Sequence, residues 1–531
     1  MSPRRICRDS KGNRDNKPRP ISVKRKSRPL NRHEMEQETA STSKSTKKLK
    51  MNEKIDIAVN ASFGYRLINF VSVFNALSDL VKCKKCDGEV TFLEGSIRGL
   101  GFKLIVKCKS CEPSGIDSCP LINSKAYEIN RRITFVFRLL GMGYAALEKF
   151  CGLMDLQRSF TEKFYNDIST HIFVAAESIA EKSMQNAVKL EKEATEKGGL
   201  TVSGDGTWHR RGFSSLFGLS TLIGYYTGKV VDILVKSSYC KQCETWEKVS
   251  ATPEYALWKE DHMDRCQSNH EGSAGKMEVS AIQEMFQRSE EKYDVQYHNY
   301  IGDGDSKTFK AILDCHPYEN ATVMKKECIG HIQKRMGTRL RNLKKKTKGL
   351  GGKGKLTDKL INELTIYYGL AIRRNTNSWE KMKDATWATF YHKISTNEHP
   401  QHHLCDSSWC SWLQAKEKNE LNNYKHPNPL PQNVQDAIQP IYVDLTAEDL
   451  LKRCEGGFTQ NCNESLNALI WSIAPKTKFC GKHTIDFAAN TATSMFNDVY
   501  DSILLMMQCM NFVIGTNCFN LCKSLDEKRL K

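Results

Sequence analysis

The sequence lacks any long apolar run and any excess of acidic residues. Its most apolar late stretch, Ile503 to Val513, is interrupted by Gln508 and Asn511 and is too short to cross a bilayer. No apolar stretch near the start resembles a signal peptide, so secretion and membrane insertion are not expected. Without a secretory signal, a disulfide framework is not expected either, although the chain holds 20 cysteines.

The composition is that of a folded protein with a polyanionic partner. The chain has 531 residues, of which 40% are hydrophobic and 26% charged, too apolar for wholly disordered protein. This length suggests about three or four domains. With 79 Lys and Arg against 61 Asp and Glu, the net charge is +18, which excludes an acidic solubilising protein.

The positive charge is concentrated in two segments. Residues 1–50 hold 16 basic and 5 acidic residues, and residues 334–359 hold 11 and 1, whereas the rest is nearly neutral. Such basic arms suit a phosphate backbone, and we expect Lys344, Lys345 and Lys346 to contact DNA. The alternative for the second segment is a solvated loop.

Residues 1–60 predict a disordered basic tail. They are rich in Lys, Arg, Ser and Pro and show no apolar periodicity. The runs Lys24 to Lys26 and Lys47 to Lys48 resemble nuclear-import patches, which predicts a nuclear location, although a basic tail also carries such runs by chance.

A zinc ribbon is predicted for residues 61–120. Two Cys-x2-Cys pairs are separated by 21 residues: Cys83 and Cys86, then Cys108 and Cys111. Two thiolate pairs on tight knuckles make a tetrahedral four-sulfur site for structural Zn²⁺. The alternative is a set of unrelated buried cysteines.

Residues 121–197 have helical periodicity. Short helices on either side of Gly141 and Gly143 are typical of a helix-turn-helix, and equally of an ordinary helical bundle. The segment from Glu181 to Lys197 predicts an exposed helix with many charged residues.

From residue 198 to residue 333 the pattern predicts strand, strand, strand, helix, strand, helix, strand, with Ala321 to Met324 as the last strand. This is the order of a ribonuclease H-like core, a mixed α/β (α+β or α/β) fold. The first strand ends at Asp205 and the fourth at Asp303, where that fold places its first two acids. Glu464, in the first turn of a later helix, completes the expected set.

Four sequence runs resemble the Mutator-like transposase domain family. They are Gly204-Asp205-Gly206-Thr207-Trp208, Ile301-Gly302-Asp303-Gly304-Asp305, Glu327-Cys328-Ile329-Gly330-His331 and Thr459-Gln460-Asn461-Cys462-Asn463-Glu464-Ser465-Leu466-Asn467. The resemblance extends over residues 65–525. Cys328 and His331 resemble the hallmark pair of that superfamily, with a metal, structural or DNA-contacting role left open.

The resemblance implies a DDE-type DNA transposase with Asp205, Asp303 and Glu464 as its catalytic triad. Converging carboxylates repel one another unless a divalent cation joins them, and hard oxygen ligands suit Mg²⁺ or Mn²⁺. Two such ions would support in-line phosphoryl transfer, for both donor cleavage and strand transfer.

Competing interpretations of the acids remain at this point. Asp-Gly is a common turn signal, so either aspartate alone is weak evidence. Asp305 competes with Asp303, which comes first after the apolar strand. Glu278, at the start of an amphipathic helix, is interpreted as a first-turn charge that matches the helix dipole.

Two further clusters resemble metal sites. Within an insert at residues 236–275, the preferred zinc ligands are Cys240, Cys243, His262 and Cys266, with His270 as the substitute; the alternative is an ordered loop with free thiols. A weaker cluster comprises His402, His403, Cys405 and Cys410, with Cys454 as an added candidate.

The remaining segments complete the predicted organisation. Residues 334–453 predict a helical insertion that begins with a basic loop, residues 454–475 the final core helix with the third acid, and residues 476–531 C-terminal helices. The expected partners are double-stranded DNA, as transposon ends and target, and a second copy of the chain.

The sequence as a whole therefore predicts cut-and-paste DNA transposition. Three alternatives remain: a domesticated, non-catalytic nuclear DNA-binding protein, a structure-selective nuclease on the same fold, and a zinc-finger adaptor without enzymatic activity.

Overall fold

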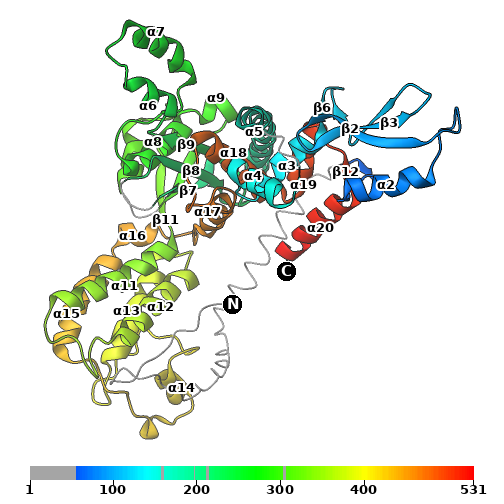
Figure 1. Cartoon of the computed structure of the whole chain (residues 1–531). Helices are drawn as coiled ribbons and strands as arrows, with labels where there is room; N and C mark the ends of the chain where they lie inside the picture. The colour runs from blue at the N-terminus through cyan, green and yellow to red at the C-terminus, as the bar shows by residue number, and fades with distance from the viewer. Residues whose placement is uncertain (1–55, 157–160, 196–197, 211–213, 303–305, 531) are drawn as a thin grey trace, which may run out of the picture. The chain divides into compact units, whose positions relative to one another are not determined.

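The computed structural model describes residues 56–530, except residues 157–160, 196–197, 211–213 and 303–305. The predicted basic tail before residue 56 lies outside the described residues, and so does Asp303. The described part has a mixed α/β fold (Figure 1). No helix within it is both long and apolar enough to span a membrane.

A five-stranded sheet forms the centre, in the order β11-β10-β7-β8-β9. The middle strand β7 is antiparallel to β8 and parallel to β10, while β8 and β9 form an antiparallel pair and β10 and β11 a parallel one. The strands are β7 (Leu200–Trp208), β8 (Phe217–Gly224), β9 (Val230–Ser237), β10 (Tyr297–Gly302) and β11 (Met324–Glu327). The last strand lies three residues later than its predicted start.

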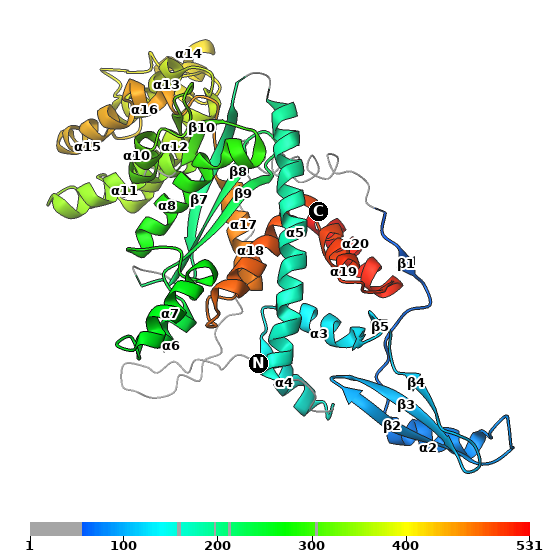
Figure 2. The same ribbon diagram turned by 90° about the horizontal axis from the view of Figure 1, so that it is seen from above.

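Helices cover both faces of this sheet (Figure 2). One face packs on α8 (Ala274–Gln287), and the other on α5 (Glu162–Ala194), α17 (Asn461–Ile473) and α18 (Lys482–Asp498). Side chains alternate between the faces along β8: Leu219 joins the core beneath α5 and α18, whereas Leu222 joins the core beneath α8.

The helical region before the sheet differs from the prediction in one respect. After α3 (Glu128–Leu139) and α4 (Tyr144–Leu153), α5 continues as a single 33-residue helix, so the predicted exposed segment from Glu181 onward is its second half. Met184 and Ala187 are buried there, because the inner stripe of α5 packs on α18 and β9, whereas Lys182, Lys189 and Glu193 are exposed. The helix-turn-helix assignment stays a prediction.

Buried Glu191 fixes the connection between β8 and β9. Its carboxylate accepts hydrogen bonds from the backbone N–H of Tyr226 and of Thr227, both at 2.8 Å, and from Thr227 Oγ1 at 2.6 Å. A Cβ atom at Gly224 would lie 2.4 Å from Glu191 Oε2, so only glycine allows this close approach. The α5 helix thus holds the hairpin turn.

Replacement of Glu191 by Ala should loosen the β8–β9 hairpin. The change leaves three donors without their acceptor, which should lower the local free energy of opening by about 2–4 kcal/mol. Hydrogen exchange of residues 217–237, followed by mass spectrometry, measures this loss. Glu193→Ala, an exposed change on the same helix, is the matched control; equal protection in the two variants would contradict the capping role.

The segment before α3 contains a separate antiparallel sheet of β2, β3 and β4. The α2 helix packs on it through ring pairs of Phe70 with Phe102 and of Phe74 with Phe92. The elements here are β1 (Val59–Asn60), α2 (Phe70–Leu80), β2 (Val90–Arg98), β3 (Gly101–Cys108), β4 (Ser114–Asp117), β5 (Leu121–Ile122) and β6 (Ala126–Tyr127). β1 pairs in parallel with β12, near the opposite end of the chain.

A helical insertion with its own apolar core separates β11 from α17. It contains α11 (Ile329–Lys346), α12 (Asp358–Arg374), α13 (Trp379–Ile394), α14 (Ser411–Glu417), α15 (Gln432–Leu445) and α16 (Glu448–Lys452). Lys344, Lys345 and Lys346 form the last turn of α11, which corrects their predicted place in a loop. Cations at a helix C-terminus stabilise the helix dipole.

The two ends of this insertion meet at Glu327. The N–H of Glu327 donates to the carbonyl of Arg453 at 2.9 Å. The buried Glu327 carboxylate lies 3.0 Å from Arg335 Nη2, 3.6 Å from Arg453 Nε and 3.7 Å from Lys325 Nζ. One carboxylate therefore joins the strand that enters the insertion to the segment that leaves it.

The C-terminal helices pack on the sheet face that α5 also covers. Asn497 Oδ1 accepts from the N–H of Val230 at 2.7 Å, and its Nδ2 donates to the carbonyl of Val230 at 2.9 Å. Beyond α18 follow α19 (Asp501–Cys509), β12 (Ile514–Gly515) and α20 (Thr516–Leu530).

Candidate active site

A polar stripe on α17 binds the central strand. Its members recur at helical spacing and face β7: Gln460, Asn463, Asn467 and Trp471. Gln460 Nε2 donates to the carbonyl of Gly204 at 2.7 Å. Buried Asn463 accepts from Ser203 Oγ at 2.8 Å and donates to the carbonyl of Ser203 at 3.2 Å.

The same stripe continues past the predicted catalytic aspartate. Asn467 Nδ2 donates to Asp205 Oδ2 at 2.8 Å, and Trp471 Nε1 donates to Thr207 Oγ1 at 2.9 Å. The helix ends at Ile473, shortly before Pro475, which cannot continue it. Along its length, then, α17 is held in a fixed register on β7.

The sequence predicted that the first strand of the sheet ends at Asp205. In the structure, Asp205 instead lies within β7. The pairing with β8 continues to Trp208 opposite Gly218, which extends the strand past the Asp-Gly pair. Side chains two residues apart share a face of a strand, so Asp205 points to the α17 side together with Ser203 and Thr207.

Glu464 projects from the first turn of α17. Its side chain is 65% exposed, and its Oε1 lies 3.9 Å from Lys334 Nζ on α11. Residues three apart lie on the same side of a helix, so Glu464 and Asn467 are neighbours. Glu464 thus lies within one turn of Asn467, the residue that donates to Asp205.

The second predicted acid follows β10, which ends at Gly302. In the parallel pairing of β10 with β7, Ile301 lies opposite Ser203. The end of β10 therefore lies beside the part of β7 that leads into Asp205. Asp303 and its competitor Asp305 lie outside the described residues.

Glu278 belongs to the opposite side of the strand. It is the fifth residue of α8, beyond the first turn, so the predicted interaction with the helix dipole is wrong. Its carboxylate packs against Gly206, where a Cβ atom would lie 2.4 Å from Glu278 Oε2. Gly206 points to the α8 face, whereas Asp205 points to the α17 face.

Two buried oxygens beside Asp205 offer further acceptor capacity. Within the described part of the chain, Asn467 Oδ1 and Gln460 Oε1 have no hydrogen-bond partner. Orphaned buried oxygens are uncommon and are satisfied by a ligand, an ion or water. Carboxylate and amide oxygens, such as those of Asp205 and Asn467, are the ligand type that Mg²⁺ and Mn²⁺ prefer. The sequence alone did not indicate that Asn467 and Gln460 bind β7, although both lie in the run that carries Glu464.

The Cys328 and His331 pair lies at the start of α11. Cys328 is the N-cap residue and packs in a small core with Ile301 and Phe458, next to the end of β10. Among the described residues, the pair belongs to none of the groups of three or more metal-ligand side chains. Its position indicates that it links α11 to β10.

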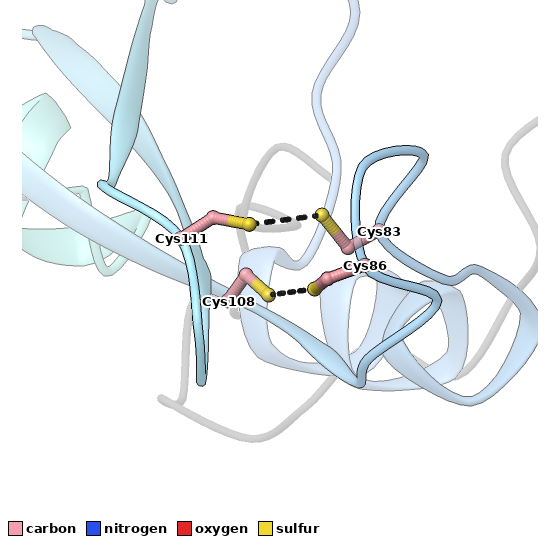
Figure 3. Close-up of side chains that lie close together, drawn as sticks. All are labelled: Cys83, Cys86, Cys108 and Cys111. Atoms are coloured by element: carbon pink, nitrogen blue, oxygen red, sulfur yellow. Dashed lines mark hydrogen bonds between the residues drawn. The ribbon is translucent and has the colours of Figure 1, made fainter.

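The four N-terminal cysteines converge as predicted from their spacing (Figure 3). The Sγ atoms of Cys83 and Cys111 lie 3.8 Å apart and those of Cys86 and Cys108 lie 3.2 Å apart. Backbone N–H groups of Lys85 and Cys86 lower the pKa of the Cys83 thiol to about 6. A thiolate is thus available at neutral pH, which is the form that binds metal.

The second cluster comprises the four preferred residues of the insert. Cys240 Sγ lies 3.4 Å from His262 Nε2, and Cys243 Sγ lies 3.5 Å from Cys266 Sγ. Burial opposes ionisation of Cys240, but backbone N–H groups, that of Cys243 first, lower its pKa to about 6. The substitute candidate His270 instead bonds the carbonyl of Ser273 through Nε2, at 3.2 Å.

The third cluster differs from its predicted ligand set. Four side chains converge: His392, His402, Cys405 and Cys410. The ring of His403 contacts Tyr391, and Cys454 bonds the carbonyl of Leu450. Because His392 is at the end of a helix ten residues upstream, a compact sequence motif could not reveal it.

Comparison with known proteins identifies the family of the chain as one of transposases. The chain matches the Mutator-like transposase family over residues 64–410, more than half of its length, and it belongs to that family. The match includes Asp205 and stops before Glu464. No curated protein matches the chain.

Replacement of Asn463 by Ala should release α17 from β7. The change leaves Ser203 without its buried partner and should lower the local stability of α17 by about 2 kcal/mol. Hydrogen exchange of residues 461–473 measures the effect. Asn461→Ala, an exposed change in the same turn, is the control; unchanged protection in Asn463→Ala would contradict the docking role.

Proposed function

We propose that this chain is a DDE-type DNA transposase with a ribonuclease H-like core. The observation that carries the proposal is the binding of α17 to β7, in which Asn467, within one turn of Glu464, donates to Asp205. The sheet supports it, because its first strand lies between an antiparallel second strand and a parallel fourth strand. This is the arrangement in which that fold gathers its acids.

The proposed catalytic residues are Asp205, Asp303 and Glu464. They supply the carboxylates that would hold Mg²⁺ or Mn²⁺ in a two-metal site, and the oxygen of Asn467 adds a neutral donor. When bound, such ions activate the attacking hydroxyl and stabilise the leaving oxygen in phosphoryl transfer. The family supplies the expected reactions, which are cleavage at transposon ends and strand transfer into target DNA.

The surrounding residues hold this site in place. The hydrogen bond from Asn467 fixes the orientation of the Asp205 carboxylate. The ammonium group of Lys334 lies near Glu464 and reduces the repulsion between converging carboxylates. Because Gln460 and Trp471 bind β7 on either side of Glu464 and Asn467, the register of α17 on β7 is fixed.

DNA binding is proposed for the basic end of α11. Lys344, Lys345 and Lys346 follow one another in its last turn, and Lys345 and Lys346 are exposed. Clustered ammonium groups bind phosphates without reading bases. The proposed partners are transposon ends and target DNA, held by a dimer or larger assembly in the nucleus.

Structural zinc is proposed for the first two clusters. The sulfur-rich sets suit Zn²⁺, and the distances between their ligand atoms are near those of a tetrahedron, about 3.6–3.8 Å for Zn–S bonds of about 2.3 Å. The first set joins the turn after α2 to the end of β3, and the second closes the insert after β9.

The decisive experiment is Mn²⁺-dependent nicking and joining of supercoiled plasmid by the purified full chain. Asp205→Asn and Glu464→Gln should each lower the rate by at least about 100-fold, because each removes a carboxylate from the metal-binding set. DNA binding, measured by fluorescence anisotropy, should stay within a few-fold. Asp294→Asn and Glu448→Gln, both at exposed sites, are the matched controls.

The outcomes of this experiment distinguish the transposase from the three alternative functions. Cleavage that persists in both Asp205→Asn and Glu464→Gln would overturn the triad. Nicking without joined products would favour the structure-selective nuclease. If the wild type binds DNA in a salt-sensitive way but cleaves neither supercoiled plasmid nor pre-cut linear ends, the domesticated DNA-binding protein is favoured. Weak DNA binding would favour the zinc-finger adaptor.

Replacement of Lys344, Lys345 and Lys346 by Ala should weaken DNA binding uniformly across sequences. Each lost phosphate contact should lower the slope of log affinity against log salt by about 0.9, so the triple change should lower it by about 2–3. Anisotropy titrations at several salt concentrations measure this slope. The triple change at the exposed lysines Lys381, Lys383 and Lys418 is the charge-matched control, and an equal loss there would contradict a localised contact.

A further inference from the structure

The helical insertion contains the third Cys/His cluster, which the proposed reaction does not use. His392 lies near the end of α13, His402 and Cys405 lie in the following loop, and Cys410 is the N-cap residue of α14. His402 and Cys410 are buried, and the other two are partly buried. Their ligand atoms all lie within 4.8 Å of one another.

The spacing of these atoms is that of a tetrahedral site. His392 Nδ1 and His402 Nδ1 lie 3.3 Å apart, and Cys410 Sγ lies 3.4 Å from His402 Nδ1 and 3.9 Å from His392 Nδ1. Cys405 Sγ lies 3.6 Å from His402 Nδ1 and 3.9 Å from His392 Nδ1. A Zn²⁺ with two N and two S ligands requires about 3.3 Å between nitrogens and about 3.6 Å between N and S.

A second layer of hydrogen bonds fixes the tautomer that such a site requires. His402 Nε2, the nitrogen away from the cluster, lies 3.0 Å from Ser395 Oγ and 2.9 Å from His426 Nε2. His426 Nδ1 lies 2.8 Å from Asn397 Oδ1, an acceptor. His426 therefore carries its proton on Nδ1 and accepts at Nε2, so His402 carries its proton on Nε2 and leaves Nδ1 free for a metal.

Aromatic rings hold the two histidines in orientation. The indole of Trp412 stacks on His402 with centroids 4.7 Å apart, and that of Trp409 packs edge-on against His392 at 5.3 Å. The next ring, His403, turns away to contact Tyr391. Adjacent histidines thus have different roles, and only one points into the cluster.

We propose that His392, His402, Cys405 and Cys410 bind a structural Zn²⁺. The mixed N and S donors favour Zn²⁺ over Mg²⁺ or Mn²⁺, and four protein ligands leave no open position for catalysis. This site is independent of the proposed transposase activity, because it lies in the insertion and shares no residue with the acidic set.

A bound metal ion would stabilise the segment between α13 and α15, which has little regular secondary structure. Between the end of α13 and the start of α15, the structure contains only α14 and the short 3-10 helix Leu421–Asn423. Cross-linking His392 to Cys410 joins α13 to α14 across this segment. A bound Zn²⁺ stabilises such a segment because the ligands converge only when it is folded.

Zinc content of the purified full chain tests the proposal. We expect three zinc ions per chain in the wild type and two in His392→Ala, measured by elemental mass spectrometry. His403→Ala is the matched control, since it changes the neighbour of His402 without touching the cluster, and it should retain three. The double change Cys83→Ser with Cys108→Ser should also leave two ions, and its combination with His392→Ala should leave one, which shows that the two variants remove different ions.

A second measurement keeps the test valid if His392→Ala fails to fold. In the wild-type chain, Cys405 and Cys410 should resist alkylation until a chelator is added, as read by mass spectrometry of their peptides. After cobalt substitution, the tetrahedral absorption band should be weaker in His392→Ala than in the wild type, because the two other Cys-rich sites remain. Unchanged zinc content in folded His392→Ala, or alkylation of both cysteines without a chelator, would overturn the proposal.

Discussion

The binding of α17 to β7 is the interaction on which the candidate active site depends. The sequence separates the two elements by more than 250 residues, and side-chain hydrogen bonds of Gln460, Asn463 and Asn467 bring them together. Gln460 and Asn463 are buried and Asn467 is partly buried, and an unpaired polar group is costly at such positions. A shift of α17 by one turn would break every bond, so one register is strongly favoured.

The long helical insertion is compatible with this register because its two ends are joined. Glu327 at the end of β11 and Arg453 at the exit of the insertion share a backbone hydrogen bond and an ion pair. The chain therefore leaves and re-enters the sheet at one place, and the insertion builds its own core around α11, α12 and α15. The α11 helix begins next to the sheet, its Lys334 Nζ lies 3.9 Å from Glu464 Oε1, and its last turn carries Lys344 to Lys346.

The cysteine and histidine clusters occur where the chain has little apolar core. The first lies beside a small three-stranded sheet, the second in the insert after β9, and the third in a segment with one short helix. Small elements bury too little apolar surface to be stable alone, and metal ligation is a common solution. The family assignment and these clusters together describe a protein with one large sheet and several small appended elements.

Local spacing in the sequence determined the strands, the Cys83–Cys111 and Cys240–Cys266 ligand groups, and the motifs that carry Asp205 and Glu464, because period, knuckle spacing and turn residues act over a few positions. It could not show that α5 is one helix with a buried inner face, that Lys344 to Lys346 end α11, or that Glu278 lies behind β7. It also could not choose His392 over His403, or reveal that Asn467 holds Asp205. These features depend on contacts between distant segments, and only the packing of helices on the central sheet decides which side chains meet.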